Sequence, residues 1–163
     1  MNIHEGRWTA RVTQDEQPVL FLIGMRVNKW WRLDLIAWTG FAMGRMLVYL
    51  RKHPEAGMLT AGNRFGRTTM QIGYWRSLEH VVRFAEDPAA PHLPAWRKYF
   101  AKAYKSGAIG VWHETHPIDG FDCVYVNMPR FGLGKAFGHA RVDGTTTTAR
   151  KRARRNARTV TTA

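Results

Sequence analysis

Apolar and polar side chains follow two different periods along the chain. Residues 19–28 carry apolar side chains at both odd and even positions, which is typical of a central β-strand covered on both faces. Between residues 30 and 53 the period lengthens, and apolar side chains recur at three- and four-residue steps, as in an amphipathic helix. Pro54 and Gly57 end this predicted helix.

The same analysis predicts the remaining elements. Residues 58–65 and 68–75 form a hairpin around a turn at 66–67, and Ser77 is a plausible N-cap for a helix that follows. The first 18 residues are polar, and we expect an irregular arm there. The other predicted elements are a helix over 78–86, a proline-rich break that contains His92, a helix over 95–105, a strand over 108–116 and a strand over 121–128.

This order predicts an α+β fold of the ferredoxin-like type, βαββαβ, with residues 121–128 as an extra strand. Helices then cover one face of the sheet only, whereas the strands are apolar on both faces. Packing of a second copy against the open face would cover it. We therefore expect a homodimer, a dimeric α+β barrel, built from a domain over residues 1–137.

Charge separates the last part of the chain from the rest. The formal net charge is +13, and the residues from Arg141 onward hold seven basic side chains against one acidic side chain. Few large apolar residues accompany them, so we expect residues 138–163 to form a disordered basic tail. Such a tail would bind anions loosely. Specific nucleic-acid binding is not expected, because the body of the chain lacks the known nucleic-acid-binding motifs.

Three negative observations bear on location and partners. The single cysteine, Cys123, cannot form an intrachain disulfide, which favours a reducing, cytoplasmic setting. The chain has no run of 18 apolar residues, and its start has no signal-peptide pattern. We therefore expect no membrane partner.

Candidate chemistry is densest in residues 109–134. Strand alternation places His113 on one face with Ile109 and Val111, and His116 on the other face. The two histidines therefore do not form a metal site. A histidine among apolar strand residues is more often structural than catalytic. The glycines of residues 132–138 lack the βαβ context of a dinucleotide site, and neither a P-loop nor a nucleophile elbow is present.

Three segments carry a family resemblance: VLFLIGMRVNKWW, IGYWRSLEHVVRFA, and IGVWHETH followed by VYVNMPRFGLG. They resemble a bacterial and fungal family of uncharacterised domains described as monooxygenase-like, which is similar to the dimeric α+β-barrel monooxygenases of antibiotic and polyketide pathways. The resemblance runs from about residue 6 to residue 137. It implies a small-molecule redox enzyme that binds an apolar or aromatic substrate in a barrel pocket. His113, Tyr74, Trp75 and Asn127 would orient the substrate and stabilise its anion.

A more distant resemblance concerns the order YWRS, histidine, WHE. It is similar to the haem-containing aldoxime dehydratases and implies that His92 is the axial iron ligand and His113 the distal acid–base group, 21 residues apart. Arg76, Arg64 or Arg26 would bind the haem propionates. Three interpretations of the function remain: a monooxygenase without a cofactor, a haem-dependent lyase of the aldoxime-dehydratase kind, and a non-enzymatic binder of haem or an apolar ligand.

Overall fold

The computed structural model describes residues 2–13 and 15–157. Its largest part is a four-stranded antiparallel sheet with strand order β3-β4-β2-β5, which is the ferredoxin-like order. The predicted fold class is thus confirmed. The bounds in this part are β2 (Val19–Val27), α1 (Leu33–Lys52), β3 (Met58–Arg64), β4 (Met70–Trp75), α2 (Leu78–Glu86), α3 (His92–Lys102) and β5 (Ile109–Pro117), with short 3-10 turns at Pro54–Ala56 and Tyr104–Ser106.

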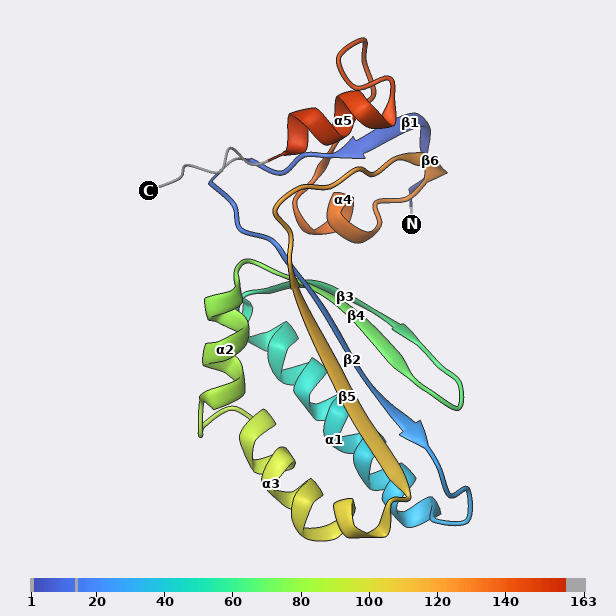
Figure 1. Ribbon diagram of the computed structural model, residues 1–163, viewed down its shortest axis with the longest axis vertical. Helices are drawn as coiled ribbons and strands as arrows, with labels where there is room; N and C mark the ends of the chain where they lie inside the picture. Colours follow the sequence, from blue (N-terminus) through green and yellow to red (C-terminus); the bar gives the residue numbers. More distant parts are fainter. Residues whose placement is uncertain (1, 14, 158–163) are drawn as a thin grey trace.

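The helices α1, α2 and α3 all pack on one face of this sheet (Figure 1). β2 is central, as its apolar pattern predicts, and pairs with β4 on one side and β5 on the other. Two apolar clusters join the layers. One is centred on Met25, Leu35, Tyr99 and Ile109, and the other contains Val19, Leu50, Trp75 and Val81.

Local signals account for the helix ends. Ser77 caps α2, since its hydroxyl accepts a hydrogen bond from the backbone N–H of His80, as predicted. The proline-rich break is shorter than expected. Pro91 is the N-cap of α3, and His92 is the first residue of that helix, where the fixed φ of proline suits a helix start.

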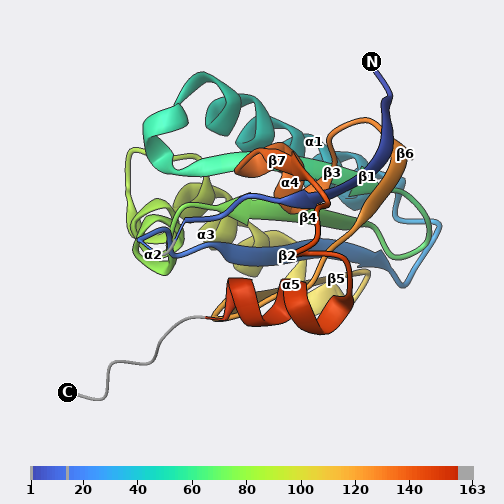
Figure 2. The ribbon, with the colours of Figure 1, turned by 90° about the horizontal axis from the view of Figure 1, so that it is seen from above.

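A second, smaller unit lies beyond one end of the main sheet. It contains β1 (His4–Ala10), β6 (Tyr125–Met128), α4 (Gly132–Ala136), β7 (His139–Arg141) and α5 (Ala149–Asn156), with strand order β6-β1-β7. Figures 1 and 2 show this small sheet and its two helices stacked above the main sheet along the long axis. The extra strand therefore belongs to this second sheet, and not to the main one. The first residues form β1 instead of an irregular arm.

The predicted disordered tail, residues 138–163, is not disordered over residues 138–157. β7 pairs with β1, and α5 holds Arg152, of which only 4% is exposed. The Arg152 guanidinium donates from Nε to Oδ1 of Asp122 at 2.6 Å and from Nη1 to the carbonyl oxygen of Thr146 at 3.1 Å. An ion pair thus replaces the apolar contacts that the composition lacks. Residues 158–163 lie outside the described part of the chain.

Candidate functional site

A mainly apolar cavity lies between the helix layer and the main sheet. It has two compartments, of about 220 Å³ and about 200 Å³, that share Ile23, Met46, His92 and His113 as wall residues. Together they reach the size of a small-molecule pocket. The first compartment is lined by α1, α3, β2 and β5, and the second by α1, α2, the start of α3, β2, β4 and β5.

His92 is half-buried in the cavity wall, at the first turn of α3. Its Nδ1–H donates a hydrogen bond to the carbonyl oxygen of Ala85, at 3.1 Å, near the end of α2. Because a carbonyl can only accept, Nδ1 carries the proton. Burial lowers the pKa of His92, and the nearby His113 lowers it further, whereas the bond to Ala85 opposes this. At neutral pH the imidazole is therefore neutral, with an unprotonated Nε2.

His113 approaches the same cavity from the sheet. It lies in the middle of β5, opposite Ile23 of β2, on the face that the helices cover. Its ring stacks on Phe21 with centroids 5.8 Å apart. The side chain is exposed to the open part of the cavity. Strand alternation thus predicted its face correctly, and the fold brings the two histidines, 21 positions apart in the sequence, to one cavity.

A buried hydroxyl adds a third polar group. Thr39 of α1 lines the first compartment and is 5% exposed, and its Oγ1 has no hydrogen-bond partner among the described residues. A buried hydroxyl without a partner is costly, so it is a candidate donor to a bound molecule. Sequence analysis missed it. The sequence feature that could have indicated a buried Thr39 is its position four residues after Leu35, on the apolar stripe of the predicted helix.

The other predicted site residues are dispersed. Trp75 is 2% exposed and lines the second compartment, with Phe21 edge-to-face against it. Tyr74, its neighbour on β4, points to the opposite face of the sheet, where its hydroxyl lies near Gly132 at the start of α4. Burial raises the pKa of Tyr74.

Asn127 and Arg76 also lie outside the two compartments. Asn127 is in β6 of the small sheet, in a left-handed backbone conformation with φ 51°, and its Oδ1 accepts a hydrogen bond from the N–H of Gly6. Arg76 is exposed just after β4. The structure therefore brings His92, His113 and Trp75 to the cavity and does not bring Tyr74, Asn127 or Arg76 there.

An outer groove of about 540 Å³ runs between α1 and the start of α3. It shares Trp38, Ala42 and Ala95 with the first compartment, so these side chains line both the groove and the cavity. Arg45 and Lys98 line the groove and supply positive charge. Within residues 2–13 and 15–157, no group of three or more His, Cys, Asp or Glu side chains could hold a metal ion.

Comparison with known proteins gives a family and a fold. A family model described as "Monooxygenase af470-like" matches residues 18–133. A search of curated proteins found no match. Among solved structures, the chain is similar to the aldoxime dehydratase OxdRE in complex with butyraldoxime, with 19% identity and a TM-score of 0.57. That match covers 71% of this chain and 34% of the other.

Two further structures are similar. A second aldoxime dehydratase matches with 16% identity and a TM-score of 0.52, over 71% of this chain and 39% of that one. SnoaB, a cofactor-independent oxygenase from Streptomyces nogalater, matches with 16% identity and a TM-score of 0.44, over 61% of this chain and 90% of its own. At these identities the two aldoxime dehydratase matches show the fold alone. The chain spans little more than a third of the aldoxime dehydratases' length.

Proposed function

The chain belongs to the monooxygenase af470-like family, and we propose that it oxidises a small apolar or aromatic molecule bound in the cavity between the helices and the main sheet. One observation carries the proposal. Two histidines border the same apolar cavity, and one of them, His92, is held neutral with its Nε2 unprotonated.

The neutral His92 suits the task of a general base. Its Nε2 would take a proton from an activated C–H or phenolic O–H of the substrate, while Ala85 holds the ring and fixes its tautomer. The resulting anion is electron-rich and donates an electron to molecular oxygen, without a cofactor. For an activated methylene the net change is CH₂ plus O₂ to C=O plus H₂O, so one oxygen atom enters the product and the other leaves as water.

Polar groups around the cavity would stabilise that anion. His113 lies beside His92 and would donate a hydrogen bond to the developing oxyanion, and the partnerless hydroxyl of Thr39 would donate a second one. In an apolar cavity each such bond is stronger than in water. Trp38, Met43 and Trp96 would hold the aromatic part of the substrate through apolar contacts.

A haem-dependent lyase is the second candidate, and the same imidazole favours it. A neutral histidine whose Nδ1 donates to a carbonyl has the arrangement of a metal-ligating histidine, with Nε2 available as the ligand. His92 would hold the iron, and His113 would move a proton on the substrate side. The bound haem would supply a Lewis-acidic iron centre. Arg45 and Lys98, at the adjoining groove, would meet its carboxylates in place of Arg76.

The proposal includes a homodimer. The face of the main sheet opposite the helices carries Leu20, Leu22 and Ile72, paired across β2 and β4 and only half-buried within one chain. Packing this face against a second copy would remove it from water. Sedimentation analysis at several protein concentrations tests this, and a single monomeric species would refute it.

Oxygen consumption with an aromatic probe tests the proposed function. Anthrone has one activated methylene, and its product, anthraquinone, is detected by absorption. We expect turnover without added cofactor, a loss of about 100-fold or more in His92→Gln, and a smaller loss in His113→Gln. His116→Gln is the control, because this exposed residue lies on the same strand but on the opposite face. Equal rates in all three variants would contradict the proposal.

Haemin titration separates the candidates. A saturable Soret shift at one haem per chain that His92→Ala abolishes and His116→Ala spares would favour the haem lyase. Ligand binding in the cavity with no turnover of anthrone or of an aldoxime would favour a non-enzymatic binder.

A further inference from the structure

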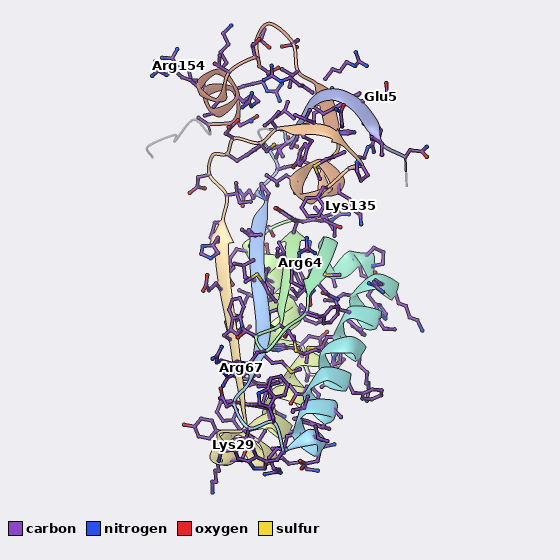
Figure 3. The ribbon with its side chains drawn as sticks, turned by 90° about the vertical axis from the view of Figure 1, so that its right-hand side faces the viewer. Glu5, Lys29, Arg64, Arg67, Lys135 and Arg154 are labelled. Atoms are coloured by element: carbon purple, nitrogen blue, oxygen red, sulfur yellow. The ribbon has the colours of Figure 1, made fainter. Side chains whose placement is uncertain are left out.

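The outward face of α1 exposes an apolar stripe that the fold leaves uncovered. The stripe runs along the helix at three- and four-residue steps through Leu33, Ala37, Phe41, Gly44 and Val48. Leu33 and Phe41 are 68% and 69% exposed, and Val48 is 50% exposed. Figure 3 shows α1 on the outside of the molecule, with side chains that project away from the sheet.

α1 is unusually apolar for a helix with so exposed a face. It is the one helix in the described part of the chain that is long and apolar enough to cross a membrane, yet only 17% of its most apolar window is buried in the protein. A core helix of this composition would be mostly buried. The proposed dimer does not cover it either, because α1 packs on the opposite face of the sheet.

Aromatic and basic residues border the stripe where α1 begins. Immediately before α1, Trp30 and Trp31 are 55% and 74% exposed, between Lys29 and Arg32. Figure 3 labels Lys29 at the end of the molecule where α1 begins. Tryptophan beside basic residues is the composition of side chains at a membrane–water interface.

The charge along this segment has one sign. Residues 29–52 contain five basic side chains and one acidic side chain, Asp34, which is already paired with Arg32 at 2.8 Å. Arg45, Arg51 and Lys52 are exposed and have no side-chain partner among the described residues. This surface therefore complements a negatively charged one that also accepts apolar side chains. Exposed tryptophans and a phenylalanine beside basic side chains on one helix face are what an anionic lipid surface accommodates.

We propose that α1 and the preceding Lys29–Arg32 segment form a surface that binds the face of an anionic lipid bilayer. The helix lies flat, with Phe41 and Val48 in the acyl-chain boundary and the basic side chains at the headgroups. This is peripheral attachment. It needs neither a long uninterrupted apolar run nor a signal peptide, whose absence led us to expect no membrane partner.

The outer groove opens beside this surface, and Phe41 and Arg45 belong to both. Through Trp38, Ala42 and Ala95 the groove adjoins the cavity. An apolar substrate dissolved in the bilayer would then enter the cavity past these three side chains. This link to substrate rests on the proposed function, whereas the lipid-binding surface rests on the exposed residues of α1.

Vesicle co-sedimentation of the full chain tests the surface independently of any activity. The probes are vesicles of phosphatidylcholine alone and of phosphatidylcholine mixed with phosphatidylglycerol, at low and high salt. We expect binding to the anionic vesicles, a blue shift of tryptophan fluorescence, and weaker binding at high salt. Absence of binding to anionic vesicles at low salt would overturn the proposal.

Matched variants locate the binding surface. Val48→Glu should lower the partition coefficient about tenfold or more, and Arg45→Glu about fivefold or more. Val126→Glu is the control for the first, since Val126 of β6 is also 50% exposed, and Arg154→Glu on α5 is the control for the second. Both controls should bind within about twofold of the unaltered chain.

Two other outcomes would overturn the proposal. If Arg154→Glu abolishes binding and Val48→Glu does not, the basic charge of α5 binds the vesicles. If Val48→Glu instead abolishes self-association in sedimentation experiments and no vesicle binding occurs, the α1 face binds a second copy of the chain. Circular dichroism of each variant confirms that these exposed substitutions leave the fold intact.

Discussion

Replacement of Arg152 by methionine tests how the C-terminal helix is held. Arg152 donates two hydrogen bonds to the carboxylate of Asp122, at 2.6 and 3.2 Å, and two to the carbonyl oxygens of Thr146 and Thr147, at 3.1 and 3.3 Å. Methionine keeps most of the apolar length of the side chain and none of its donors. The variant therefore isolates the polar contacts.

The magnitude follows from the exposure of the partners. Breaking a fully buried ion pair costs about 3–5 kcal/mol. The Asp122 side chain is 35% exposed, so water replaces part of what it loses. Thr146 is completely buried, however, so its carbonyl oxygen loses a partner that water cannot replace. We expect Arg152→Met to lower the free energy of unfolding of the small unit by about 2–4 kcal/mol.

The assay combines urea unfolding, followed by circular dichroism, with limited chymotrypsin digestion read by mass spectrometry. Digestion detects opening of the small unit even where the main sheet stays folded. Arg150→Met, at an exposed position of the same helix, is the control and should cost less than about 0.5 kcal/mol. If the two variants unfold at the same urea concentration and are cleaved at the same rate, the Arg152 contacts do not hold α5.

Three further predictions follow from the main sheet and its cavity. Burial lowers the pKa of His92, so below about pH 6.5 the unfolded chain takes up a proton at this residue more readily than the native state does. The free energy of unfolding should therefore fall as the pH drops through this value. In urea titrations, His92→Gln should make the free energy of unfolding depend less on pH. Thr39→Val removes a hydroxyl that has no hydrogen-bond partner within residues 2–13 and 15–157. Thermal unfolding should therefore show a free energy of unfolding that is unchanged or higher by up to about 1 kcal/mol. A clearly lower stability would contradict this prediction. Gly24→Ala places a Cβ that overlaps the carbonyl oxygen of Thr69 and lies 2.8 Å from Nε1 of Trp112. We expect this overlap to lower the free energy of unfolding by about 3 kcal/mol. A variant as stable as the original chain would refute the close approach.

The main sheet could be predicted from the sequence because its signals are local. The apolar parity of residues 19–28 and the longer period after residue 30 each require only the chain within one element. The side of the sheet that His113 faces follows from the same two-residue repeat. The position of His92 across the cavity from His113 does not follow from periodicity, since that position depends on how α3 folds back over β5. The resemblance to the aldoxime dehydratases supplied that pairing.

The small unit could not be predicted because its signals are not local. β1 reads HEGRWTA, a mostly polar strand whose partners lie more than 110 residues further along the chain. α5 reads ARKRARRN and has almost no apolar content. The burial of its Arg152 side chain depends on Asp122, thirty residues earlier, and a composition-based argument cannot anticipate an ion pair across that distance. Thr39 was missed for a different reason, because one hydroxyl on an apolar helix face does not alter the period.

The pairing of β1 with β6 and β7 sets an order of folding during synthesis. β1 leaves the ribosome before its partners at residues 125–128 and 139–141, which follow only after more than 110 further residues. At ordinary translation rates this delay is on the order of ten seconds. The ferredoxin-like part is complete by residue 117 and can form in that interval. β1 meanwhile waits as an unpaired strand, and the small sheet closes only when β6 and β7 reach it.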